Sequence, residues 1–193
     1  MLLNILLFLL LTFIIFVIYR LYNPKSPHRS LLYSEKGKNI TIIYSSPYKN
    51  GRLIFGTKSE SALVKFDNYW RTGANRRTII KTDTDLSFEN NILLRGEYVI
   101  FTKPGLNKWD ITFNSTKSYF GSFKPKPEMD LFTVSASPRI LKTPIEQLTF
   151  DFIPYNKSDL NTNALRLRWD YTEVVIPFKS VSYTHLTLPT KRI

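Results

Sequence analysis

The sequence predicts an all-β fold: an antiparallel β-sandwich, jelly-roll-like or immunoglobulin-like, preceded by one N-terminal transmembrane helix. Apolar and polar residues alternate with the period of two that half-buried strands show, most clearly at 109–114 and 165–170. Turn-forming residues separate about eight such runs. A short helix is expected only at residues 58–68, and the absence of crossover helices favours antiparallel pairing.

The N-terminal segment is long, apolar and uncharged. Residues 2–19 hold no charged side chain, and as a helix they would span ~27 Å, close to the ~30 Å hydrocarbon core of a bilayer. Arg20 begins a basic flank, and Tyr22 suits the membrane interface. A cleaved signal peptide is the alternative, but no basic residue follows Met1 and no small-residue cleavage site is visible. We therefore expect residues 1–22 to be an uncleaved anchor that contacts the membrane through residues 2–19.

Three further segments complete the expected organisation. Residues 23–37 are predicted to be a juxtamembrane linker that prolines stiffen. Residues 38–179 are expected to form the sandwich domain. Residues 180–193 include VSYTHLTLPT, which resembles a translated sequencing adapter, so we expect an assembly scar there and a missing natural C terminus.

The chain is basic, with 27 basic and 15 acidic residues and a net charge of +12. Five of the positive charges lie in residues 1–29 and 180–193, which leaves +7 for residues 30–179. No basic helix, zinc spacing or RNA-binding signature accompanies this charge, so no nucleic-acid partner is expected. A lysine-rich soluble surface is the favoured interpretation, and contact with anionic lipid is the alternative.

The composition excludes several chemistries. The absence of cysteine rules out thiol nucleophiles and cysteine-ligated metals. His28 lies in the expected linker and His185 in the expected scar, which argues against serine–histidine catalysis and histidine metal sites. Asp83 and Asp85 form a pair that can bind calcium, but they lack the glycine and glutamate of an EF-hand loop. We therefore expect no catalytic residues, no metal site and no cofactor.

An enzyme acting on envelope carbohydrate stays open as an alternative. Such an enzyme would need two carboxylates facing one another across a cleft. Glu97, Asp110 and Glu173 are the acids from which this pair would be drawn.

The most distinctive stretch is NYWRTGANRRT, at residues 68–78. Trp70 is expected to anchor it in the core, while Gly73 and Asn75 suit a backbone with positive φ. The guanidinium of Arg71 could either tie loop carbonyls together or hold a carboxylate or another anion. The stretch is therefore either a tethered corner or an anion clamp.

Strands 147–153 and 164–171 are expected to form a hairpin with two different faces. One face would bury leucine and phenylalanine against Trp169. The other would carry Arg166 and Arg168 beside Asp151, which is an ordinary cross-strand charge pairing.

Five sequence blocks resemble a known family when they are taken together. They are NGRLIFG at 50–56, YWRTGAN at 69–75, LRGEYVIFTKPG at 94–105, WDITFN at 109–114 and LRLRWDYTEVVIPF at 165–178. In this order they resemble the bacterial domain-of-unknown-function family 2911, over roughly residues 38–178. The resemblance implies a β-rich domain, found largely in Bacteroidota-like bacteria and usually behind an export signal, with no established activity.

The motif residues that carry over from the family are Gly51, Arg52, Phe55, Gly56, Trp70, Arg71, Thr72, Gly73, Ala74, Asn75, Gly96, Tyr98, Pro104, Gly105, Trp109, Asn114, Trp169 and Pro177. Three departures stand beside them. Ser46 precedes Pro47 where the family tends to have arginine, Arg76 follows the G-A-N where it tends to have an acid, and extra residues occur around TKSES. These departures lower the expectation of enzymatic activity.

The sequence thus predicts a non-enzymatic module that binds a small molecule, a glycan or an envelope protein. The expected ligand-binding residues are Arg52, Arg71, Thr72 and Asn75. A purely structural envelope module is a further alternative. We expect a single-pass bacterial membrane protein whose domain lies outside the cytoplasm, although the basic flank after the apolar run favours the opposite orientation.

Overall fold

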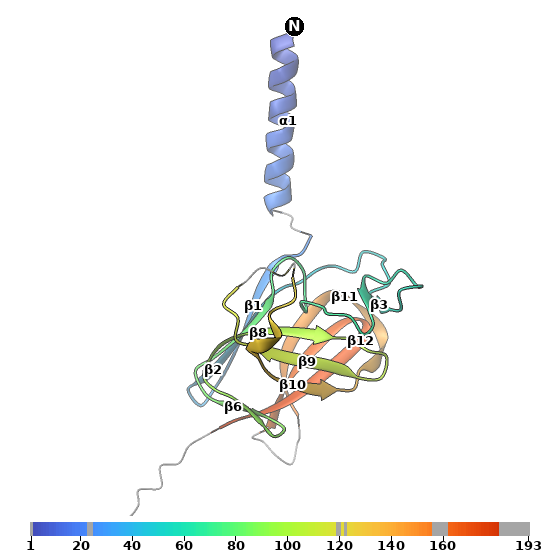
Figure 1. The fold of residues 1–193 in the computed structure, drawn as a ribbon. Coiled ribbons are helices and arrows are strands. Elements are labelled where there is room, and N and C mark those ends of the chain that lie inside the picture. The colour runs from blue at the N-terminus through green and yellow to red at the C-terminus, as the bar shows by residue number, and fades with distance from the viewer. Residues whose placement is uncertain (1, 23–24, 119–120, 122, 156–161, 182–193) are drawn as a thin grey trace, which may run out of the picture.

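The computed structural model of the protein describes residues 2–22, 25–118, 121, 123–155 and 162–181, with main chain alone at 2, 20 and 21. Strands dominate, and one helix precedes them (Figure 1). In chain order the elements are α1 (Leu2–Tyr22), β1 (His28–Glu35), β2 (Lys38–Ser45), β3 (Phe55–Gly56), β4 (Val64–Lys65), β5 (Thr78–Thr82), β6 (Leu86–Phe88), β7 (Asn91–Leu93), β8 (Gly96–Lys103), β9 (Trp109–Asn114), the 3₁₀ turn η1 (Pro127–Met129), β10 (Asp130–Ala136), β11 (Arg139–Pro154) and β12 (Thr162–Ser180).

Two antiparallel sheets form the body of the domain, which confirms the predicted β-rich, antiparallel class. One sheet has the strand order β1-β2-β5-β8-β9-β10, and the other has the order β11-β12-β6-β7. The chain leaves the first sheet after β5, forms the β6–β7 hairpin in the second, and returns as β8. The short strands β3 and β4 pair in parallel outside both sheets.

The core lies between the two sheets, because each contributes its apolar face to one buried cluster. Aromatic pairs join the layers directly. Phe88 of β6 lies 4.7 Å from Phe113 of β9, and Tyr44 of β2 lies 4.8 Å from Phe150 of β11, measured between ring centroids. Such pairs stabilise a fold through buried area and through ring–ring contact.

The helix predicted at residues 58–68 is wrong. In this stretch turns at residues 58–61 and 66–67 lie on either side of β4. The Glu60 carboxylate accepts hydrogen bonds of 2.6 Å from both the main-chain nitrogen and the hydroxyl of Thr57, and this contact closes a tight turn. Such a contact often starts a helix, but Ser61 adopts a left-handed φ of 56°, which keeps the turn from continuing as a helix.

The linker predicted at residues 23–37 is also corrected. Its second half forms β1, which pairs along its full length with β2, from His28 opposite Ser45 to Glu35 opposite Lys38. The hairpin closes at Lys36 and Gly37, whose φ angles are 51° and 76°. Two adjacent residues with positive φ match the tight turns that suit the twist of a β-hairpin.

Helix α1 stands out from the β domain (Figure 1), and its described side chains are exposed. Within the part of the chain that the structure describes, no helix combines the length and the hydropathy of a membrane span. The transmembrane anchor predicted for residues 1–22 stays a prediction.

At the other end, strand β12 continues through Ser180, which pairs with Leu86 of β6. The main-chain nitrogen of Val181 donates a 2.8 Å hydrogen bond to the carbonyl of Asp85. The first two residues of the predicted scar at 180–193 therefore belong to the sheet region. Residues 182–193 lie outside the described residues.

Phe113 offers a test of this packing, because its side chain is fully buried and its ring lies between those of Phe88 and Phe132. Phe113→Ala is expected to lower the free energy of unfolding by about 3–5 kcal/mol, since it leaves a cavity in the core. Urea denaturation measures the loss. Phe123→Ala is the matched control, because that side chain is 80% exposed. Equal losses in the two variants would contradict the packing.

Candidate functional site

The 68–78 stretch forms a corner that is hydrogen-bonded to β8 and packed against β2. Trp70 pairs with Thr102 of β8 through two main-chain hydrogen bonds of 2.8 and 2.9 Å. The Trp70 indole nitrogen donates to the carbonyl of Gly73 at 3.1 Å, which closes the turn from inside. Gly73 itself lies against β2, because a Cβ there would come within 2.9 Å of the Ser45 carbonyl oxygen. The predicted core anchor and tethered corner are therefore present.

Two non-glycine residues of the corner adopt the left-handed conformation. Asn75 has a φ of 61°, as its residue type suggests. Thr72 has a φ of 58°, which is unusual for a β-branched residue. The Thr72 hydroxyl donates to the carbonyl of Trp70 and to the hydroxyl of Thr102, and Thr78 donates to the Thr72 carbonyl at 2.6 Å. These buried contacts hold Thr72 in its strained conformation.

The three arginines of the stretch have different surroundings. Arg77 is buried and donates to the carbonyls of Ser118 (2.5 Å) and Phe123 (2.7 Å), so its guanidinium is held by main-chain contacts. Arg76 is exposed. Arg71 is half-buried and donates to the carbonyl of Asn75 at 3.3 Å. No carboxylate among the described residues pairs with the Arg71 guanidinium.

A pocket of about 1020 Å³ opens beside this corner. Arg71 and Asn75 line it together with Arg52, so three of the four predicted ligand-binding residues share one pocket. The fourth, Thr72, is 1% exposed and does not line it. Thr72 instead stabilises the corner through its buried hydrogen bonds with Trp70, Thr78 and Thr102.

The other residues that line the pocket come from distant parts of the chain. Asn50, Trp70 and Trp169 line the same pocket, as do Lys25 and the α1 side chains Phe16 and Val17. No acidic side chain belongs to this lining within the described part of the chain. The wall therefore combines uncompensated positive charge, side-chain amides and tryptophan rings.

Arg52 reaches the pocket from the loop between β2 and β3. Its guanidinium donates to the carbonyls of Lys49 (2.8 Å) and Tyr48 (2.5 Å), and these bonds fix the side chain without neutralising it. The loop is anchored in turn by an ion pair between Lys49 and the buried carboxylate of Asp170. Its hydrogen bond to Asp170 raises the pKa of the Lys49 amine, which keeps this amine charged.

Trp169 lies at the base of the pocket beside this ion pair. Its side chain is 1% exposed and stacks on Trp70, with ring centroids 5.9 Å apart and planes 19° apart. The indole nitrogen of Trp169 is buried without a hydrogen-bond partner among the described residues. The Trp169 ring therefore forms a closely packed part of the pocket wall.

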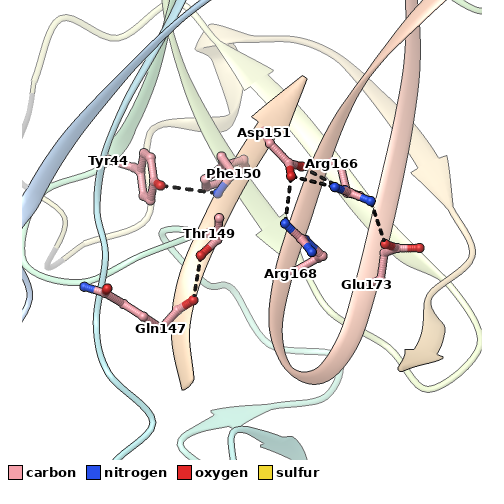
Figure 2. A network of polar contacts seen from close by, with 8 residues as sticks. All are labelled: Tyr44, Gln147, Thr149, Phe150, Asp151, Arg166, Arg168 and Glu173. Carbon is pink, nitrogen blue, oxygen red and sulfur yellow. Dashed lines mark hydrogen bonds and ion pairs between the residues drawn. The ribbon is translucent and has the colours of Figure 1, made fainter. Parts of the chain in front are cut away.

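The hairpin of β11 and β12 carries a charge network on the face opposite to the one that buries Trp169, as predicted (Figure 2). Asp151 accepts two hydrogen bonds from Arg166 (2.8 and 2.6 Å) and one from Arg168 (2.8 Å). Arg166 also lies 3.6 Å from Glu173. The two cations are matched by two anions, so this network is a cross-strand pairing and offers no free charge to a ligand.

The acids proposed for an enzyme do not form a facing pair. Glu97 contacts Lys81 at 2.8 Å, while Asp110 contacts Lys108 at 3.0 Å. Asp110 pairs with Lys103, six residues along β8 from Glu97, which corresponds to roughly 20 Å. The third acid, Glu173, lies in the other sheet and takes part in the network of Figure 2.

The pKa directions also fail to identify a general acid, which would need a raised carboxyl pKa. Partial burial raises the pKa of Asp110, but the hydrogen bonds from Lys108 and Ser135 and the lysine charges outweigh it, so the net pKa is low. The carboxyl pKa is lowered at Glu35, Glu60, Asp83, Asp110 and Asp151.

The positions of His28 and of the Asp83 and Asp85 pair bear on the expected absence of a metal site. His28 lies in β1 and not in a linker, with its Nδ1 atom 3.4 Å from the Ser45 hydroxyl. Asp83 and Asp85 cap different segments, since Asp83 accepts from Asn39 and Asp85 from the main chain of Arg95. No group of three potential metal ligands occurs among the residues that the structure describes.

Sequence reasoning missed three contributions to the pocket. The sequence places Lys25 in the linker and Trp169 on the core face of the hairpin. The ion pair of Lys49 and Asp170 joins residues 121 positions apart. The signal closest to it in the sequence is the K-N-G turn, which indicates a loop but not its partner.

Comparison with known proteins gives one match. A family model described as "Protein of unknown function (DUF2911)" matches residues 26–178. The match begins within two residues of β1 and ends inside β12, and it covers the corner and most of the residues that line the pocket. No curated protein and no solved structure matches the chain.

The network of Figure 2 generates a pH prediction. Burial raises the pKa of Asp151, but the hydrogen bonds and charges of Arg166 and Arg168 outweigh it and hold the pKa below its usual value. The resulting stabilisation is fully present above the unfolded value of about 3.9 and is lost as the pH falls through the lower folded value. Asp151→Asn should therefore reduce the melting temperature most near pH 7, with a gap that narrows toward about pH 2.

Thermal unfolding of wild type and variant across this pH range measures the gap. Glu128→Gln is the control, because that exposed carboxylate receives no hydrogen bond or ion pair from the described residues. A gap for Asp151→Asn that stays constant with pH would contradict the account.

Proposed function

The chain belongs to the family described as "Protein of unknown function (DUF2911)", and from its pocket we propose that it is a non-enzymatic, membrane-anchored module that binds a small anion. The carrying observation is that Arg52 and Arg71 line one pocket whose lining, within the described part of the chain, includes no acidic side chain. Charge without a partner in a concave wall is costly unless a ligand of opposite sign compensates it.

The arginines suit this role because each is fixed by main-chain contacts and keeps donors to spare. Arg52 is held by the carbonyls of Tyr48 and Lys49, and Arg71 by the carbonyl of Asn75. A guanidinium presents five donors in a rigid fork, and carbonyls use some of them without cancelling the charge. Asn50 and Asn75 supply amide groups from the same wall.

The carbohydrate-active alternative has less support, since Glu97, Asp110 and Glu173 each pair with a different base and share no cleft. A purely structural module would leave the pocket empty under all conditions. We favour binding because the charge of the lining is uncompensated, whereas the arginine pair of the β11–β12 hairpin is fully matched.

Membrane attachment through residues 2–19 belongs to the same proposal. It is supported by the absence of any charged residue in this segment and by the exposure of its described side chains. Placement of the domain outside the cytoplasm is supported by the resemblance to exported relatives. The basic residues that follow the apolar run favour the cytoplasmic side and make orientation a necessary test.

Anion binding is tested with the full chain in detergent, titrated with phosphate, sulfate and small carboxylates while tryptophan fluorescence is followed. Arg71→Gln is expected to weaken binding by ~10–100-fold, the usual cost of losing a hydrogen bond to a charged group. Arg52→Gln provides a second variant, with an exposed side chain at the edge of the site.

Arg76→Gln is the matched control, because it removes the same charge from an exposed neighbour that does not line the pocket. Equal weakening in all three variants, or no response of the wild type to any anion, would contradict the proposed function.

Orientation is tested by a single cysteine, which is possible because the chain contains none. Leu106→Cys places it on a turn where the side chain is 71% exposed. A membrane-impermeant maleimide should label this variant in intact spheroplasts. Labelling that requires lysis of the inner membrane would place the domain in the cytoplasm.

A further inference from the structure

We propose that the bound anion is a phosphate monoester and that its source is the headgroup of an anionic lipid such as phosphatidic acid, in the membrane to which α1 would attach the domain. This inference rests on the proposed anion binding and membrane attachment, and it adds the chemical class and origin of the ligand.

The charge of the pocket favours phosphate over a simple carboxylate. Lys25, Arg52 and Arg71 all contribute to the lining, and the described lining holds no acid. One carboxylate brings a single negative charge, whereas a phosphate monoester carries about −1.5 to −2 and has three strong acceptor oxygens. Arginine forks bind phosphate in bidentate fashion, and lysine adds a point charge.

The position of the pocket favours a lipid as the source. Phe16 and Val17 of α1 line the same pocket as Arg71. Phe16 lies three residues before Tyr19, the end of the apolar run, which corresponds to about 4.5 Å along a helix. The headgroup region adds roughly 5–8 Å to each side of the hydrocarbon core. In that arrangement Phe16 and Val17 would lie just inside the edge of the hydrocarbon core, and Lys25, which follows the apolar run, would lie toward the lipid phosphates.

The lining of the pocket also suits the apolar part of such a ligand. Leu63 lines the pocket and is 47% exposed, and its main-chain nitrogen bonds to the carbonyl of Leu53, which is 45% exposed. Leu63 therefore offers an exposed apolar side chain at the pocket that suits contact with acyl chains. The volume of about 1020 Å³ accommodates a group much larger than free phosphate.

The experiment compares lipid and free phosphate on the same protein. The full chain is reconstituted into nanodiscs of phosphatidylcholine alone, or of phosphatidylcholine with one fifth phosphatidic acid, and its melting temperature is measured. Phosphatidic acid should raise the melting temperature of the wild type by at least roughly 2 °C, and of Arg76→Gln equally. Arg71→Gln and Arg52→Gln should lose this rise. In a second arm, inorganic phosphate and glycerol 3-phosphate are added to the chain in detergent.

The outcomes separate the two proposals. A rise with phosphatidic acid that depends on Arg71 and Arg52 supports the lipid source. A response to free phosphate without any difference between the nanodiscs overturns the lipid inference and leaves anion binding intact. A rise with phosphatidic acid that persists in both variants shows general surface attraction and also overturns it. Absence of a response in both arms removes both the inference and the function on which it rests.

Discussion

The packing of Trp70 is the contact on which the arrangement of the site depends. Its ring stacks on Trp169 of β12 at 5.9 Å and meets the edge of Trp109 of β9 at 6.0 Å, so a loop residue joins both sheets. Phe55 contacts all three rings, at 4.9 to 6.0 Å between centroids. Because this cluster is buried, the loops before β3 and before β5 meet at a fixed position at the end of the two-sheet body.

Because Trp70 is anchored in the core, the polar loop that follows it can hold the charged side chain of Arg71 in a fixed position. Arg71 follows Trp70 directly, and Thr72 is held by buried hydroxyl contacts to β8. On the outer side Gly121 lies so close that a Cβ there would come within 2.7 Å of the Arg71 side chain. A side chain restrained in this way loses less entropy when a ligand binds, which increases affinity. The tethered corner and the anion clamp are therefore compatible interpretations of one structure.

The sequence predicts the local features well and the long-range ones poorly. Alternation of apolar and polar residues locates β9 and the hairpin of β11 and β12, because half-burial leaves a period of two. The edge strand β1 is not predicted, because Leu32 is exposed and its neighbours are only half-buried, so its apolar residues do not follow that period clearly. Arg52, Arg71 and Asn75 were selected from residue type and resemblance, and the fold brings them to one pocket. The contribution of Trp169 required knowledge of the register between β12 and the corner, and no local pattern encodes it.

The central claim is that the Arg71 guanidinium holds an anion in a pocket that Trp169 completes. It is tested most directly by nuclear magnetic resonance of the side-chain Nε–H of Arg71 and the indole Nε1–H of Trp169 during titration of the full chain with glycerol 3-phosphate. The account predicts that both signals shift together and saturate, while the signal of Arg76 stays in place. Shifts of Arg71 and Arg76 that are equal and do not saturate, with an unchanged Trp169 signal, would contradict it.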